Sequence, residues 1–199
     1  SATRNNHGIA VATASILTVN NGQLSLTGTG GGGGNGTLNH GIDLTKGTVR
    51  ALGTGSLSLS GTAGKAGSGI TASSYASITT VSGSITMTGH GGAGASNNRG
   101  IYLSTSTLQS TGGGDITLLG VANPGTTGSG NTGVYILSST LGTTGSFSIT
   151  GTGGNGTGSN HGIHLNGITG TTAASVTATG YVLAGQPASS KPTYGNFFP

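Results

Sequence analysis

Only two side chains in this 199-residue sequence carry a carboxylate, Asp43 and Asp115, and the chain contains neither Glu nor Cys. Hydrolysis of a glycosidic bond by paired carboxylates would have to use these two residues. Without Cys, thiolate zinc sites and disulfides are excluded, and several carboxylates for a calcium cage are not available. The repeats described below separate the two residues by two coils, about 10 Å, and put them on different faces. We therefore predict that the protein is not an enzyme.

Histidines recur at one kind of position. His7, His40 and His161 each precede a Gly-Ile dipeptide, Arg99 does the same elsewhere, and His164 lies close behind His161. Imidazole pairs bind Zn or Cu, but a firm site needs three or four ligands. We expect no carboxylate or thiolate beside these rings. The favoured interpretation is exposed turn histidines, with no metal and no other cofactor.

These residues belong to a chain of six repeats. A Gly that is followed by Ile or Val and preceded by a polar residue recurs at Gly8, Gly41, Gly69, Gly100, Gly133 and Gly162. Successive spacings are 33, 28, 31, 33 and 29 residues, a mean of about 31. A second glycine recurs in step at Gly28, Gly61, Gly89, Gly120, Gly151 and Gly180. Because two registers agree, the chain is predicted to be a stack of six similar units.

Apolar and polar residues alternate within each repeat, which predicts three short strands and no helix. The inward pairs of the first strand are Ile9/Val11, Ile42/Leu44, Ile70/Ala72, Ile101/Leu103, Val134/Ile136 and Ile163/Leu165. The middle strand contributes Ile16, Val49, Ile78, Leu108, Leu141 and Ile168. The third strand supplies Leu24/Leu26, Leu57/Leu59, Ile85/Met87, Ile116/Leu118, Phe147/Ile149 and Val176/Ala178.

One such unit cannot bury its own apolar side chains, whereas six units stacked in register share one interior. The sequence therefore predicts an all-β fold, a parallel β-helix of about six three-strand coils over residues 1–184. Gly is abundant, 44 of 199 residues, and is expected at the corners, where it permits a positive φ. The length variation falls between the closing and the opening glycines, which predicts loops of unequal length along one edge.

Two polar columns follow from this register. Two residues before the opening glycine stand Asn6, Asn39, Asn98, Asn131 and Asn160, with Gly67 in the third repeat. Stacked Asn amides are expected to form a hydrogen-bonded structural ladder. The third strand points outward at Ser25, Thr27, Ser58, Ser60, Thr86, Thr88, Thr117, Ser148, Thr150, Thr177 and Thr179, with Leu119 as an interruption. We interpret this hydroxyl face as a neutral wet surface, with binding to a crystalline surface such as ice as the alternative.

The repeat pattern stops after Gly180, and residues 185–199 form a Pro-rich and aromatic tail. Its Tyr194, Phe197 and Phe198 would be costly to leave in water. We expect the tail either to cap the last coil or to dock on the next molecule.

The segments Gly100-Ile101-Tyr102-Leu103 and Gly114-Asp115-Ile116-Thr117-Leu118 resemble the strand repeats of large bacterial surface proteins of the filamentous-haemagglutinin type. The resemblance extends from Asn6 to Gly180. It implies a right-handed β-helix, export to the cell surface, and a role in adhesion or extracellular structure. The chain differs from giant adhesins in its length and in its aromatic tail.

The leading functional prediction is a secreted or cell-surface fibre subunit that stacks head to tail on copies of itself, because a β-helix has open strand edges at both ends. The alternative is a monomeric binding module, either an adhesin segment that contacts cell-surface glycans or an ice-binding β-helix. Six scattered Lys and Arg and a net charge of +4 do not predict nucleic-acid binding. No run of about 18 apolar residues predicts membrane insertion.

Overall fold

The computed structural model of the chain describes residues 5–32, 38–171 and 173–181. Within these residues the fold is all-β, with three parallel six-stranded sheets and no helix. The predicted tail, with Tyr194, Phe197 and Phe198, lies outside the described residues, as does the predicted domain boundary between residues 184 and 185.

Each repeat contributes one strand to each sheet. Sheet A contains β1 (Ile9–Ala10), β4 (Ile42–Thr45), β7 (Ile70–Ser73), β10 (Ile101–Ser104), β13 (Val134–Leu137) and β16 (Ile163–Asn166). Sheet B contains β2 (Ile16–Asn20), β5 (Thr48–Leu52), β8 (Ser77–Thr80), β11 (Thr107–Ser110), β14 (Thr140–Thr143) and β17 (Thr169–Thr171). Sheet C contains β3 (Gln23–Thr29), β6 (Ser56–Thr62), β9 (Ile85–His90), β12 (Ile116–Val121), β15 (Ser146–Thr152) and β18 (Ser175–Tyr181). The predicted stack of coils is confirmed.

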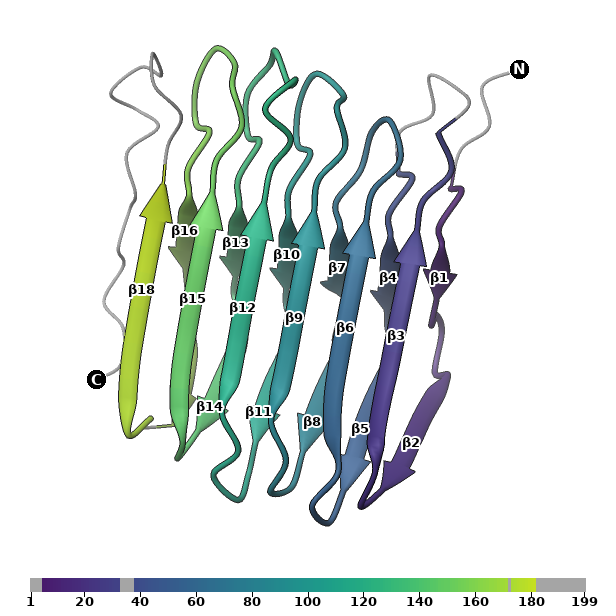
Figure 1. The fold of residues 1–199 in the computed structure, drawn as a ribbon, viewed down its shortest axis with the longest axis vertical. Helices are drawn as coiled ribbons and strands as arrows, with labels where there is room; N and C mark the ends of the chain where they lie inside the picture. Colours follow the sequence, from purple (N-terminus) through teal and green to yellow (C-terminus); the bar gives the residue numbers. More distant parts are fainter. Residues whose placement is uncertain (1–4, 33–37, 172, 182–199) are drawn as a thin grey trace.

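Figure 1 shows how the coils are wound. Sheet C lies in front, and sheets A and B lie behind it, in the upper and lower parts of the view. The chain rises along the front sheet, crosses the top and descends behind, while successive coils advance from right to left. This winding is right-handed. The long connections from sheet C to sheet A all lie along the top edge, where the unequal loops were predicted.

The strand register reproduces the repeat spacing residue by residue. Ile42 pairs with Ile70, Ile70 with Ile101, and Ile101 with Val134. The predicted inward residues of the four middle coils are buried, for example Leu44, Ile78 and Phe147. Stacking identical strand positions thus forms one continuous apolar interior.

One predicted middle-strand residue was wrong, and a second packs against the core but lies outside its predicted column. Ile16 is 58% exposed, and Leu17, not Ile16, pairs with the buried Val49. The segment that begins at Ile16 has two adjacent apolar residues, and only Leu17 and Val19 share the period of β5. In the last coil Gly170 pairs with Leu141, while Ile168 lies ahead of β17 and packs against the core from there.

The repeated glycines serve close backbone packing. A Cβ on Gly61 would overlap the carbonyl oxygen of Gly69, and a Cβ on Gly41 would overlap the backbone N of Thr62. These contacts recur where each sheet C strand ends beside the start of a sheet A strand. The absence of a side chain at both glycine columns lets these two backbones approach each other.

The prediction that glycine provides the positive φ at the corners was wrong for the turn between sheets A and B. The positive-φ residues there include Lys46 (φ 60°), Thr105 (49°) and Ser138 (46°), and only the last coil uses Gly167 (62°). The cost of a side chain in this conformation is of order 1–2 kcal/mol, small enough for the stacked neighbours to offset.

Candidate functional site

The outer face of sheet A carries most of the chemically distinctive side chains. Its first outward column, in register, is Ala10, Asp43, Thr71, Tyr102, Tyr135 and His164. Beside it, directly before the strands, backbone hydrogen bonds align the column His7, His40, Ser68, Arg99, Thr132 and His161. The two columns form one strip that runs along the axis of the coil.

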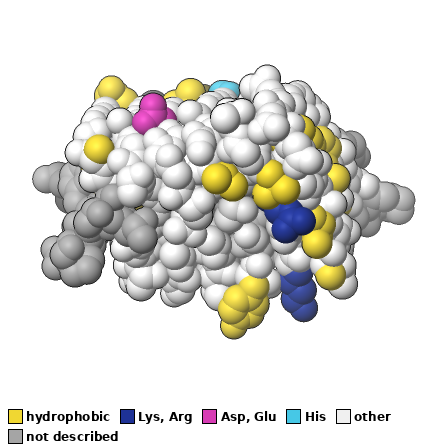
Figure 2. Space-filling model, turned by 90° about the horizontal axis from the view of Figure 1, so that it is seen from below, with side chains coloured by type: hydrophobic (Ala, Val, Ile, Leu, Met, Phe, Trp, Pro, Cys, Tyr) yellow, Lys and Arg dark blue, Asp and Glu magenta, His cyan; other side chains and the backbone are white. Residues whose placement is uncertain are grey.

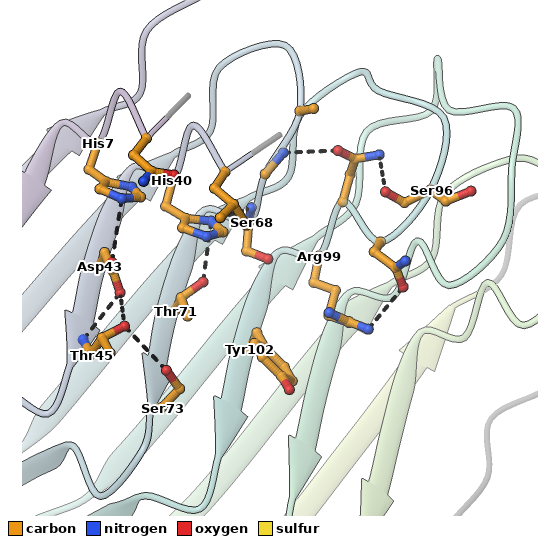
Figure 3. A pocket seen from close by; sticks show the side chains of 16 residues that line it. His7, His40, Asp43, Thr45, Ser68, Thr71, Ser73, Ser96, Arg99 and Tyr102 are labelled. Carbon is orange, nitrogen blue, oxygen red and sulfur yellow. Dashed lines mark hydrogen bonds and ion pairs between the residues drawn. The ribbon is translucent and has the colours of Figure 1, made fainter. Parts of the chain in front are cut away.

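A hollow of about 540 Å³ interrupts this strip at the third coil. Its floor consists of small residues, Ser68, Thr71 and Ser73. His7, His40 and Asp43 stand on one side of the hollow, and Arg99 and Tyr102 stand on the other (Figure 3). The loop that leads into the third coil is also the shortest of the five, which leaves the hollow open to solvent along that edge.

The first wall is an imidazole and carboxylate cluster. The rings of His7 and His40 stack with centroids 5.2 Å apart and planes 4° apart. His7 Nε2 lies 3.5 Å from Asp43 Oδ2, while Asp43 Oδ1 accepts hydrogen bonds from the backbone N and from Oγ1 of Thr45, at 3.1 and 2.7 Å. Both carboxylate oxygens of Asp43 are therefore engaged by neighbours within the protein.

His40 is held as a neutral ring. The backbone N of Ser68 donates to His40 Nδ1 at 2.9 Å, so the ring proton is on Nε2. Burial lowers the pKa of His40 below the ordinary value of 6.5; Asp43 opposes this shift and His7 adds to it. The prediction of exposed turn histidines was wrong, because His40 and His161 are each only 8% exposed. The expectation that no carboxylate lies beside the rings was also wrong, because Asp43 does.

The second wall consists of the Arg99 guanidinium packed against two tyrosine rings. The Arg99 guanidinium carbon lies 4.5 Å from the ring centroid of Tyr102 and 4.6 Å from that of Tyr135. The two tyrosine rings stack with centroids 5.6 Å apart. Tyr135 covers the Tyr102 face that points toward the fifth coil, so the opposite face of Tyr102 borders the hollow. Arg99 Nη2 donates to Asn97 Oδ1 at 3.0 Å.

A second, smaller hollow of about 220 Å³ continues the strip beyond Arg99. It is lined by Tyr135, His161 and His164, among others, and Arg99 borders both hollows. His164 contacts Tyr135 and His161, with centroids 4.6 and 5.0 Å apart. Burial, and after it the neighbouring His161 and Arg99, lower the pKa of His164.

The site does not assemble the ligand set of a firm metal centre. Among the described residues, no three His, Cys, Asp or Glu side chains gather closely enough to hold an ion. The second predicted carboxylate, Asp115, lies away from the strip, at the turn before β12, where its Oδ1 accepts a hydrogen bond from the backbone N of Ser146 at 2.8 Å.

The five predicted Asn residues stack beside the strip, and Asn39, Asn98, Asn131 and Asn160 are buried. One amide-to-amide bond of the predicted ladder is present, because Asn98 Nδ2 donates to Asn131 Oδ1 at 3.1 Å. The column also bonds to the backbone. The Oδ1 atoms of Asn39, Asn131 and Asn160 accept from the backbone N of the Asn one coil earlier. The Nδ2 atoms of Asn131 and Asn160 donate to loop carbonyls. The column therefore ties the loops that contain Ala95 and Gly128 to the sheet A edge, and Arg99 directly follows one of its members, Asn98.

The eleven predicted Ser and Thr residues of the third strand lie in two registered columns on the outer face of sheet C. Leu119, 38% exposed, interrupts the second column. The two columns present hydroxyls and contain no charge. Figure 2 shows the molecule from below, where the surface is likewise largely neutral, with few acidic and basic side chains.

The repeat spacing predicts the column that contains His7, His40, Arg99 and His161, whereas the column beside it was missed. That second column occupies the outward position of the Gly-Ile-x-Leu motif and brings Tyr102 and Tyr135 beside Arg99. That signal is present in the sequence once the register is known. The hollow depends in addition on the small residues and short loop of the third repeat.

No helix among the described residues is long and apolar enough to cross a membrane. No protein-family model, curated protein or solved structure matches the chain at a significant level.

Proposed function

We propose that this protein is an extracellular adhesive β-helix that binds a saccharide chain along the outer face of sheet A. The observation that carries the proposal is the hollow over the third coil, with an open tyrosine face on one side and hydrogen-bonding groups around it. The resemblance to surface-protein repeats favours the extracellular location and the adhesive role.

The chemistry of the lining matches a polyhydroxylated ligand. A sugar ring has an apolar C–H face, which packs on an aromatic ring, and hydroxyls that both donate and accept. Tyr102 offers the ring face, Arg99 and the neutral His40 offer donors, and the hydroxyls of Ser68, Thr71 and Ser73 offer both functions. The hollow is shallow and polar, which suits a flexible, well-hydrated chain better than an apolar small molecule.

The proposed role is binding without turnover. Among the described residues, Asp43 is the only carboxylate that lines the hollow, whereas hydrolysis of a glycosidic bond usually requires two. Both oxygens of Asp43 are also engaged by Thr45 and His7.

A panel of immobilised neutral and acidic hexasaccharides tests the proposal. We expect at least one to bind, and Tyr102→Ala to weaken that binding about tenfold, equivalent to about 1.4 kcal/mol. Ser73→Gln, which fills part of the floor, should weaken it similarly without removing the aromatic ring. Tyr75→Ala is the matched control, because Tyr75 is 83% exposed and outside the hollow. Failure of every saccharide to bind would refute the proposal.

End-to-end assembly into a fibre is a second candidate, favoured by the terminal coils. Val176 of β18 is 39% exposed, whereas Phe147 and Ile85 at equivalent positions are almost completely buried. Leu24 and Leu26 of β3 are likewise only half-buried. A second copy stacked on either end would continue all three sheets and cover these residues, and such a contact does not close.

Sedimentation velocity and electron microscopy test assembly. Val176→Lys should abolish filaments, while Thr177→Lys, which places the same charge on the outward side of the same strand, should retain them. Deletion of residues 186–199 tests separately whether Tyr194, Phe197 and Phe198 contribute to the contact between stacked molecules. A wild-type chain that stays monomeric at high concentration would exclude this candidate.

A further inference from the structure

We propose that the saccharide held by this site carries carboxylate groups, and that Arg99 binds one of them between the two hollows of the sheet A strip. This inference rests on the proposed function and specifies its ligand. The observations behind it concern the charges around the hollows and the bonding of Arg99.

Arg99 has no acidic partner in the part of the chain that the structure describes. The one ion pair recorded among the described residues joins His7 and Asp43. A guanidinium has five N–H donors, and the only hydrogen bond recorded for that of Arg99 within the described ranges goes to the neutral Asn97. Its Nε is buried without a partner. A half-buried cation without a counterion is unfavourable unless a ligand anion completes it.

The single carboxylate of the site does not fulfil that role. Asp43 stands on the opposite wall of the larger hollow, where Thr45 and His7 occupy its oxygens. Among the described lining residues, Arg99 is therefore a cation without an ionic partner, and it stands on the wall opposite Asp43. This arrangement favours an anionic group of a ligand beside Arg99.

The tyrosines explain why this cation is an arginine. Tyr102 and Tyr135 support its planar guanidinium at 4.5 and 4.6 Å. A planar guanidinium fixed in this way forms parallel hydrogen bonds to a planar carboxylate, which a lysine ammonium cannot do. The same stacking leaves the outer face of Tyr102 free for the ring of the sugar that carries the acid.

The position of Arg99 favours a chain over a single acidic sugar. Arg99 borders both hollows, so a ligand that occupies both passes over it. Adjacent coils are about 4.8 Å apart, close to the length of one sugar unit in an extended chain. A polymer of uronic acid units can thus place successive rings along the strip, with one carboxylate at Arg99.

Isothermal titration with a matched pair of ligands tests this inference. The probes are a hexamer of galacturonate and the same hexamer after reduction of its carboxyl groups to neutral galactose units. We expect the acidic hexamer to bind wild type at least tenfold more tightly than the neutral one at 150 mM salt. Arg99→Gln should remove this preference, so that the variant binds the two hexamers with the same weakened affinity. Arg99→Lys keeps the positive charge but lacks the planar guanidinium, so it should retain only part of the preference for the acidic hexamer.

Arg50→Gln is the control for general charge, because Arg50 is exposed on sheet B, where its Nε donates to Thr18 Oγ1 at 2.9 Å. Circular dichroism confirms that each variant is folded. Equal affinity for the two hexamers would overturn the acidic inference and leave saccharide binding intact. An equal loss of acidic binding in Arg50→Gln and Arg99→Gln would also overturn it. If neither hexamer binds and the wider saccharide panel is also negative, the proposed function fails together with this inference.

Discussion

The outer faces of sheets A and C are built on the same repeat and differ in almost every side chain that they present. Sheet C carries two columns of Ser and Thr, interrupted by Leu119, with no charged residue. Sheet A carries Asp43, Tyr102, Tyr135 and His164 in one column and His40 and Arg99 in the next. Outward side chains are free of the packing that constrains inward ones, so the same backbone repeat accommodates both the hydroxyl face of sheet C and the charged and aromatic face of sheet A.

The variable loops account for part of this difference. They connect sheet C to sheet A along the top edge, so their lengths alter the start of sheet A and leave the centre of sheet C unchanged (Figure 1). A short loop and three small residues at the third coil are enough to open a hollow. The hollow thus arises where one repeat departs from its neighbours.

The largest loss of stability is expected at the glycine columns, where the backbones of sheets C and A pack closely against each other. Gly61→Ala would force a Cβ into the carbonyl oxygen of Gly69, where sheet C gives way to sheet A. We expect a loss of about 3 kcal/mol in the free energy of unfolding, measured in urea, because backbone on both sides cannot move aside. Gly22→Ala is the control, because its nearest neighbour is a Val19 methyl at 3.5 Å. An unchanged midpoint for Gly61→Ala would contradict the close-packing explanation.

A smaller loss of stability is expected at the Asn column beside sheet A, and almost none on the outer face of sheet C. Asn131→Ala removes the acceptor of the Asn98 backbone N and the donor to the carbonyls of Ala95 and Gly128, all beside sheet A. Leaving these buried groups unsatisfied should cost about 2 kcal/mol. Ser148→Ala on the sheet C face should stay within about 0.5 kcal/mol of wild type. Similar losses in both variants would mean that the Asn column contributes no more than a surface hydroxyl.

Acid should destabilise the protein through the sheet A side. Burial lowers the pKa of His40 in the folded state below 6.5, so the unfolded chain takes up the proton first as pH falls. Stability is therefore fully present above pH 6.5 and declines below it, until the folded pKa is passed. Melting temperatures between pH 7.5 and pH 5 measure this decline, which His40→Gln should reduce. A decline of the same size in His40→Gln would assign the acid sensitivity to other groups.

The smallest effect is expected on sheet C itself. Thr86→Tyr and Thr88→Tyr each place a larger side chain on the outer face of sheet C, away from the hollow. We therefore expect no change in saccharide affinity, and a change of no more than about 0.5 kcal/mol in the free energy of unfolding. Thermal hysteresis of ice growth provides the opposite test. If the wild-type protein shows hysteresis and these variants lose it, sheet C and not sheet A is the working face.

Much of the fold was predictable because the same pattern of residues recurs in each repeat. The glycine columns and the alternation of Ile and Leu predict the coil length, the three strands and most of the core. The errors in the predicted core fell where repetition is weakest. Ile16 and Ile168 lie in the terminal coils, where only one neighbouring strand restrains the register.

The sequence by itself determined the stack, because an interior shared by six coils permits only one register of buried residues. It also determined that charge is scarce, with six basic and two acidic side chains. Only the tertiary structure decided what those few charges do. Asp43 and His7 lie 36 residues apart in the chain, and Arg99 and Tyr135 likewise, yet coiling brings each pair into contact. Such contacts depend on the side-chain directions and loop lengths of neighbouring coils, which no single repeat specifies.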